Sequence, residues 1–182
     1  EYGIRLAPVR LSRLLEEKDY REQVEACVNA LPRVIEVFNR AVFDLRKGGI
    51  DPLVHPLADD YLPLHISCAS DATRLPLRRR DGLGGTYAVA TCGCGARYRF
   101  RLGRRELSLD EIAQTHRWSP DVLLLIFVND LASGVVAGKS SAIYGMVLNR
   151  VLREALDKEP IPMLVPEGLT SRAPDRTPLV AD

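Results

Sequence analysis

The hydrophobic residues of this chain recur with two different periods, and the change of period near residue 60 limits the folds open to it. Over residues 11–47, apolar side chains recur every three or four positions, the period of an amphipathic helix. Pro32 would cost about 3 kcal/mol inside a helix but is accepted in a first turn, so we expect two helices with a break beside it. Gly48 and Gly49 are expected to end the second helix.

After a connection that contains prolines, the sequence changes to short segments of the type that forms strands. The expected strands are residues 62–67, 73–80, 86–91 and 96–102. Two glycine-containing turns separate the last three of them. In residues 98–102 apolar side chains alternate with arginines, as in a strand that turns one face to solvent. We therefore predict a small antiparallel β subdomain.

The pattern beyond residue 107 returns to helices and ends in a second strand-like segment. Ser108 to Glu111 reads as a capping box that opens a short helix, and Ser119 with Pro120 is expected to open another that ends at Leu131. Further on we expect a helix and then a buried strand, at residues 141–158 and 161–165. Helices, a β module, more helices and a strand indicate an α/β protein that carries an inserted β subdomain.

Length and composition bound the class of protein. With 182 residues the chain has room for one domain, or for one domain and an appendage. The longest apolar run, residues 122–128, is far shorter than the roughly 20 residues of a membrane span. The sequence opens on Glu1 without an apolar signal segment, so we expect a cytoplasmic location. Because it does not begin with Met, a trimmed chain and one piece of a longer polypeptide both stay open.

The strongest chemical signal is the set His65, Cys68, Cys92 and Cys94. Zinc in structural sites takes four thiolate or imidazole ligands at about 2.0 to 2.3 Å, and these usually arrive as two close pairs. Here each pair lies at the end of an expected strand. We therefore predict a structural zinc ion held by these four residues.

Other interpretations of these residues remain open. His116 or His55 could take the place of His65 as the fourth ligand, and free cysteines beside a surface histidine would give the same sequence. Disulfides are not expected in the cytoplasm. The remaining cysteine, Cys27, lies on an apolar helical stripe and is predicted to be a core residue.

A glycine-containing segment, residues 133–141, precedes the expected helix at 141–158. Free amides and the positive end of the helix dipole at such a position favour an anion. The segment is not a Walker loop, because only three residues separate Gly134 from Gly138 where that motif has four. An ordinary helix start capped by serine explains it equally well. The candidate residues for a substrate or a nucleotide such as ATP are Asn129, Asp130, Gly138, Lys139, Ser140, Ser141 and Tyr144.

Arginine is concentrated in the β subdomain. Nine arginines and one acidic residue, Asp81, lie between residues 73 and 105, although the whole chain has 25 basic and 24 acidic groups. Such a face could contact nucleic acid, with Tyr87, Tyr98 and Phe100 as stacking partners. Solvated strand faces would explain the same residues.

Several segments carry a resemblance to a known family. They are Trp118-Ser-Pro-Asp-Val-Leu-Leu-Leu, the pair Asn129-Asp130, Gly138-Lys-Ser-Ser-Ala-Ile-Tyr144, Ile161-Pro-Met-Leu-Val-Pro166 and, upstream, Gly49-Ile-Asp-Pro-Leu-Val-His55 and Leu62-Pro-Leu-His65. Together they resemble the middle part of the bacillithiol synthase family, the cysteine ligases that complete bacillithiol. The chain departs from the family pattern at Leu125, Asn129 and Ser141, where the family has Arg, Gln and Glu.

The resemblance implies a partial Rossmann-like core with a pocket near Gly138. The resulting prediction has four parts: an N-terminal helical segment (1–50), a zinc-ribbon-like β subdomain (51–107), helices and a strand of the core (108–170), and a tail (171–182). The implied activity joins a cysteine-like amino acid to an amine in thiol or natural-product biosynthesis. A partner chain or further segments of a longer polypeptide would complete the core.

Two other functions fit the sequence. One is a zinc-ribbon module that binds RNA or DNA through its arginine face within a larger assembly. The other is an amino-acid-activating enzyme, because Gly138-Lys-Ser-Ser is distantly similar to the lysine-serine loop of class I aminoacyl-tRNA synthetases.

Overall fold

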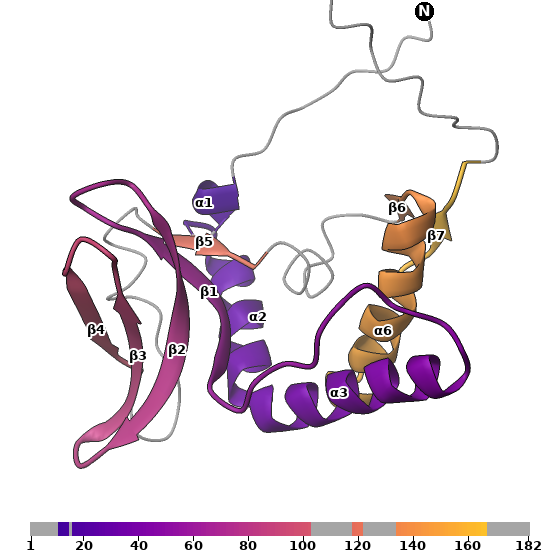
Figure 1. Ribbon diagram of the computed structural model, residues 1–182, viewed down its shortest axis with the longest axis horizontal. Coiled ribbons are helices and arrows are strands. Elements are labelled where there is room, and N and C mark those ends of the chain that lie inside the picture. Colours follow the sequence, from indigo (N-terminus) through magenta and orange to yellow (C-terminus); the bar gives the residue numbers. More distant parts are fainter. Residues whose placement is uncertain (1–10, 15, 103–117, 122–133, 167–182) are drawn as a thin grey trace, which may run out of the picture.

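The computed structural model describes residues 11–14, 16–102, 118–121 and 134–166 (Figure 1). It contains helices and a five-stranded antiparallel sheet, so the predicted mixture of helix and sheet is confirmed. The elements in chain order are α1 (Leu11–Leu14), α2 (Lys18–Asn29), α3 (Leu31–Lys47), β1 (Tyr61–Ser67), β2 (Arg74–Gly82), β3 (Gly85–Thr91), β4 (Arg97–Arg101), β5 (Trp118–Pro120), β6 (Val135–Val136), α6 (Lys139–Ala155) and β7 (Met163–Leu164).

The two helices predicted from the helical period are α2 and α3. Pro32 lies in the first turn of α3, where its missing N–H removes no helical hydrogen bond. Helix α3 ends at Lys47, and Gly48 donates its backbone N–H to the carbonyl oxygen of Asp44 at 3.0 Å. Cys27 is fully buried on α2, which confirms it as a core residue. The start of α3 beside Pro32, its end before Gly48 and the buried position of Cys27 all follow from patterns that are local in the sequence.

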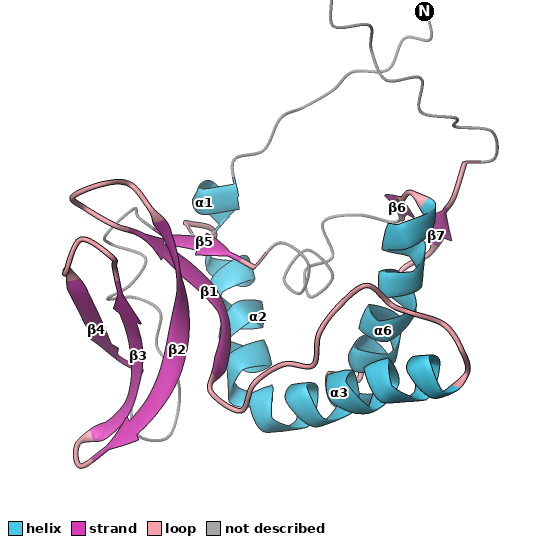
Figure 2. Ribbon diagram, in the orientation of Figure 1, coloured by secondary structure: helices cyan, strands magenta, loops and turns pink. Residues whose placement is uncertain are grey.

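The predicted antiparallel β subdomain is confirmed, and its strands run in the order β4-β3-β2-β1-β5 (Figure 2). Proline cannot donate to a sheet ladder, and Pro63 lies in β1 between two other strands. The pairing of β1 with β2 accordingly shifts register between Tyr61 and His65, on either side of that proline. Along each strand of the sheet, successive side chains point alternately toward the core and outward.

Ser119 and Pro120 correct the sequence prediction. They were expected to open a helix, but they lie in β5, which pairs with β1 from His65↔Ser119 to Leu64↔Pro120. Because β5 is an edge strand, the proline is tolerated there. The remainder of that expected helix, up to Leu131, and the helix expected from Ser108 lie outside the described residues.

Beyond the sheet, β6, α6 and β7 form a second unit in which the two short strands pair in parallel. Helix α6 confirms the helix predicted at 141–158, with both ends two to three residues earlier. The strand predicted at 161–165 is only two residues long, and it is not buried because Leu164 is 65% exposed. Gly145 lies so close to β7 that an added Cβ would collide with the side chain of Met163.

One hydrophobic core joins the sheet to the helices. The inner face of the sheet packs beside α2, while α3 contacts α6 (Figure 1). Trp118 is 2% exposed, and its ring meets that of Phe100 edge-on with centroids 5.2 Å apart. None of the described helices combines the length and the apolar character needed to cross a bilayer.

Candidate metal centre

Two hairpin turns at the same end of the sheet carry four potential metal ligands. Cys68 and Asp71 lie in the connection from β1 to β2, and Cys92 and Cys94 lie in the connection from β3 to β4. Antiparallel pairing places these two connections at the same end of the sheet (Figure 1). Backbone hydrogen bonds fix each turn: the N–H of Cys68 donates to Thr73 at 2.8 Å, and the N–H of Cys92 donates to Ala96 at 2.8 Å.

The distances within the cluster fit a metal ion. One ligand atom from each of the four residues lies within 4.8 Å of all the others. The Sγ atoms of Cys68 and Cys94 are 3.6 Å apart, far longer than the roughly 2.05 Å of a disulfide and close to the roughly 3.8 Å edge of a tetrahedral zinc site with Zn–S bonds of about 2.3 Å. The Sγ of Cys92 lies 3.2 Å from a carboxylate oxygen of Asp71.

Hydrogen bonds lower the pKa of two of the ligands, Cys68 and Asp71. The Tyr98 hydroxyl donates to Cys68 Sγ at 3.3 Å, and together with the backbone N–H of Ser70 it lowers the pKa of that thiol to about 7. The backbone N–H of Thr73 and then the Cys92 thiol hold the pKa of the Asp71 carboxyl at about 2. Both groups therefore favour the charged form that binds a cation.

Cys92 holds its proton more firmly than Cys68 does when no metal ion is bound. The backbone N–H of Cys94 favours the thiolate, but burial and the neighbouring thiols and carboxylate outweigh it and raise the pKa to about 12. A divalent cation would reverse that balance, because its charge deprotonates a coordinating thiol. Binding is therefore expected to release protons.

The turn after Cys94 needs glycine. Gly95 has φ of +91°, a backbone conformation that side chains disfavour, and its N–H donates to the carbonyl oxygen of Cys92 at 3.0 Å. The sequence analysis singled out Cys68, Cys92 and Cys94 as ligands, and the structure brings all three together.

His65, the fourth predicted ligand, lies outside this cluster. It belongs to β1, three residues before Cys68, and an extended strand rises about 3.3 Å per residue. Its Nδ1 lies 3.2 Å from Nη2 of Arg74. Burial and then the Arg74 charge lower its pKa. His55 is exposed and outside the cluster as well, and His116 lies outside the described residues.

Asp71 occupies the place that the sequence analysis gave to histidine. The signal was present as Cys68-x-x-Asp71, because two intervening residues are the usual spacing of a zinc ligand pair. A carboxylate oxygen is also an accepted zinc ligand. Asp71 is therefore a ligand that a pattern of sulfur and imidazole residues does not predict.

The predicted anion-binding residues lie at the start of α6. Gly138 is the N-cap residue, Lys139, Ser140 and Ser141 form the first turn, and Ser141 is exposed. Tyr144 follows one turn later, partly buried with its ring edge-on to Phe38 at 6.2 Å. Asn129 and Asp130 lie outside the described residues.

Asp121 is a polar residue beside this region that the sequence analysis did not select. It follows β5, and its carboxylate accepts a hydrogen bond from the Tyr61 hydroxyl at 2.8 Å. Burial and then the Asp121 charge raise the pKa of Tyr144. The charge of Asp121, directly after β5, therefore acts on Tyr144 of α6, although the two residues are separate in sequence.

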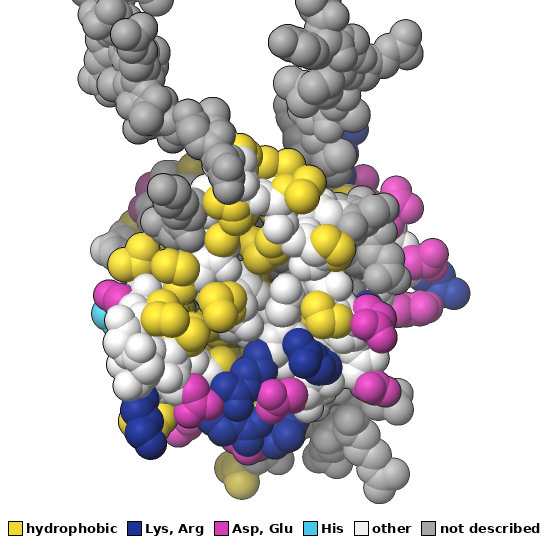
Figure 3. All heavy atoms as spheres, turned by 90° about the vertical axis from the view of Figure 1, so that its right-hand side faces the viewer, with side chains coloured by type: hydrophobic (Ala, Val, Ile, Leu, Met, Phe, Trp, Pro, Cys, Tyr) yellow, Lys and Arg dark blue, Asp and Glu magenta, His cyan; other side chains and the backbone are white. Residues whose placement is uncertain are grey.

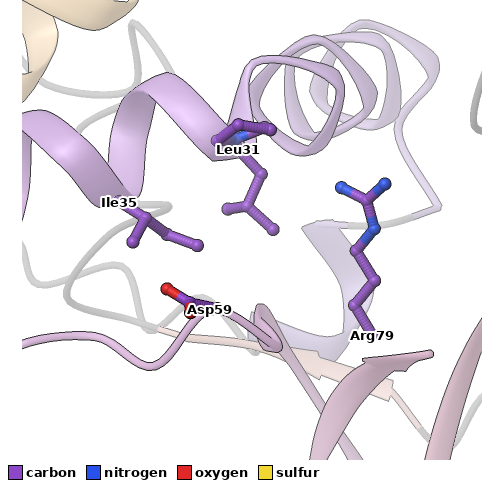
Figure 4. A pocket seen from close by; sticks show the side chains of 5 residues that line it. Leu31, Ile35, Asp59 and Arg79 are labelled. Carbon is purple, nitrogen blue, oxygen red and sulfur yellow. The ribbon is translucent and has the colours of Figure 1, made fainter. Parts of the chain in front are cut away.

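A shallow crevice of about 270 Å³ lies between α3 and the sheet (Figure 4). Leu31 and Ile35 form its apolar side, and Asp59 and Arg79 lie at opposite edges. The Nε of Arg79 is buried and has no hydrogen-bond partner among the described residues, although it lies 3.7 Å from a carboxylate oxygen of Asp81. The described residues that line it include no thiol or imidazole, so the cysteine cluster is the better candidate for a functional centre. No protein-family model matches the chain, and the search of curated proteins found no relative.

Proposed function

We propose that this chain is a zinc-binding α/β domain in which one zinc ion, held by Cys68, Asp71, Cys92 and Cys94, locks a ribbon-like β subdomain. The observation that carries the proposal is the approach of one ligand atom from each residue to within 4.8 Å of the others. Three thiolates and one carboxylate suit zinc, whereas magnesium and calcium select oxygen ligands.

The proposed role of the ion is structural. Four protein ligands complete a tetrahedron and leave no position for a substrate or an activated water. Cys68 and Cys92 are 3% and 4% exposed, so their sulfurs lie in the subdomain rather than on its surface. A zinc ion would tie the β1–β2 turn to the β3–β4 turn, which are far apart in sequence.

Metal analysis of the full chain, purified without added metal, tests this proposal. We expect about one zinc per chain in the unaltered protein and none in the Cys92→Ser/Cys94→Ser variant. Cys27→Ala is the matched control, because it removes a buried cysteine remote from the cluster and should leave the zinc in place. Absence of zinc from the unaltered protein, or equal zinc in the double variant, would contradict the proposal.

A second candidate function is small-molecule ligation on a scaffold of the bacillithiol synthase type. Its support is the β6–α6–β7 unit, in which parallel strands flank a helix as in Rossmann-like folds. Residues 138–141 lie at the amino end of that helix, where anionic groups bind. Asp121 and Tyr144 would line the same pocket, and the reaction would join a cysteine-like amino acid to an amine.

The same unit would need further protein to be complete. Parallel sheets are normally covered on both faces, yet Val136 is 70% and Met146 54% exposed. Hydrophobic side chains gather on the side of the molecule shown in Figure 3. This exposure supports an enzyme built from a longer chain or from a partner.

Ligand binding tests the ligase candidate. ATP and cysteine are titrated separately into the full chain, and saturable binding that Lys139→Ala weakens is expected. Lys47→Ala, an exposed lysine at the end of α3, is the matched control. Identical binding by Lys139→Ala and the unaltered protein would contradict this site. Amino-acid-dependent pyrophosphate exchange would instead indicate an amino-acid-activating enzyme.

A further inference from the structure

The outward face of the β2-β3-β4 sheet is lined by arginines. Directly paired residues of an antiparallel sheet share a face, and the register sets Arg78 opposite Val89 and Val89 opposite Arg99. The next row joins Arg80, Tyr87 and Arg101. Alternation along β2 and β4 adds two more arginines, so this arginine face comprises Arg74, Arg78, Arg80, Arg97, Arg99 and Arg101.

Few acidic groups neutralise the arginine face. Among the described residues, Asp60 is the acidic residue that pairs with the arginine face. Its carboxylate lies 3.3 Å from Arg78 and 3.5 Å from Arg80. The three arginines of β4 are exposed and have no acidic partner in the described part of the chain. They recur at every second residue and so span about 13 Å along one strand. The face therefore presents a row of uncompensated positive charge.

An aromatic ring lies within this row. The guanidinium carbon of Arg99 is 3.8 Å from the centroid of the Tyr87 ring, which gives a stacked cation and ring on the sheet. The other predicted stacking residues do not contribute: Tyr98 and Phe100 alternate with the arginines and stack on each other on the opposite side, 6.5 Å apart. Tyr87 is thus the aromatic residue that the described strands β2, β3 and β4 place on this face.

We propose that the arginine face binds single-stranded nucleic acid. Guanidinium groups bind phosphate oxygens through paired hydrogen bonds, and their planes also stack on bases. An exposed row of arginines beside a partly exposed ring on a sheet surface suits splayed bases better than an intact duplex, whose bases are stacked inside. The proposal goes beyond the zinc-binding function, which would hold β3 and β4 in register at one end.

Fluorescence anisotropy with a labelled 12-nucleotide single strand tests the proposal on the full chain. For single strands, log affinity falls with log salt with a slope of about −0.7 for each phosphate contact. Arg97→Gln/Arg101→Gln should therefore bind several-fold more weakly and reduce the slope by about 1.4. Arg13→Gln/Arg153→Gln is the matched control, because it removes the same charge from α1 and α6 and should leave the affinity unchanged.

A second variant distinguishes specific binding of nucleic acid from binding of any polyanion. Tyr87→Leu keeps every charge and should weaken the oligonucleotide several-fold while leaving inorganic polyphosphate unaffected. Circular dichroism and thermal unfolding of each variant confirm that the sheet is intact. Equal losses in the two arginine variants, no effect of Tyr87→Leu on the oligonucleotide, or tighter binding of the matching duplex would each overturn the proposal.

Discussion

Tyr98 shows how one side chain can organise the metal centre without being a ligand. Its hydroxyl accepts a hydrogen bond from the backbone N–H of Ala69 at 2.8 Å and donates one to Cys68 Sγ at 3.3 Å. It therefore holds the β1–β2 turn against β4 and stabilises the Cys68 thiolate. Groups that orient metal ligands in this way contribute to affinity although they do not touch the ion.

Replacing Tyr98 with phenylalanine should weaken zinc binding. The ring and its packing remain, but both hydrogen bonds are lost, and removal of such supporting groups typically costs about 10- to 100-fold in metal affinity. Competition with a zinc chelator measures the change. Tyr87→Phe, on the opposite side of the sheet, is the control, and equal affinities of the two variants would contradict a positioning role for Tyr98.

Residue by residue, the sequence predicted the sulfur ligands but not the fourth one. Cysteines beside glycines at the ends of strands indicate a metal turn, because turns bring close neighbours together. His65 does not join the cluster, because it lies inside an extended strand that places it about 10 Å from Cys68. Asp71 was missed because acidic residues are common in ordinary turns, so the carboxylate stands out only once the folded turn is known.

At the scale of elements, Asn39 fastens a long connection to a helix. Its side-chain amide donates to the carbonyl oxygen of Leu57 at 2.9 Å and accepts the Leu57 N–H at 2.7 Å. Asn149 on α6 makes the same pair of bonds to Ile161. In both cases an amide side chain satisfies the backbone of a connection that has no strand partner at that point.

Asn39→Ala should lower the free energy of unfolding by about 1 to 3 kcal/mol, because it leaves a partly buried N–H and a carbonyl without partners. Chemical denaturation with far-UV circular dichroism measures the loss. The control on the same helix is Arg33→Ala, which removes an exposed ion pair with Glu36 and should cost less than about 1 kcal/mol. A loss no larger than that of the control would show that the connection does not depend on Asn39.

Elements with strong local signals were predicted well, and those decided by distant pairing were not. The break at Pro32 and the alternation in β4 depend on neighbours in sequence, and both are confirmed. Ser119 and Pro120 satisfy the local rule for a helix start, but pairing with β1 places them in a strand. The short β6 was not predicted, since two residues carry no period.

At the scale of the whole molecule, charged side chains connect α3 to α6. Arg150 lies 2.6 Å from Asp44 on α3 and 2.8 Å from Glu154 on its own helix. Arg40 of α3 also pairs with Glu154. The hydrogen bond from Arg150, with a smaller contribution from Arg40, lowers the pKa of the Glu154 carboxyl. An ionised Glu154 therefore contributes to the ion pairs between the helices.

This network predicts a loss of stability in acid. A carboxyl group whose pKa is lower in the folded chain stabilises the fold above its ordinary pKa of 4.5, and that contribution disappears as the pH falls through the lowered value. The melting temperature should therefore fall less steeply below pH 4.5 in Glu154→Gln than in the unaltered chain. Glu22→Gln, in an exposed pair within α2, is the control. Parallel curves for all three proteins would contradict the prediction.

Zinc X-ray absorption spectroscopy of the full chain tests the central claim, the four-ligand metal centre, most directly. We predict three sulfur ligands at about 2.3 Å and one oxygen at about 2.0 to 2.2 Å, and four sulfur ligands in Asp71→Cys. An imidazole nitrogen in place of the oxygen would show that a histidine, and not Asp71, is the fourth ligand. A shell without three sulfurs would contradict the centre formed by Cys68, Asp71, Cys92 and Cys94.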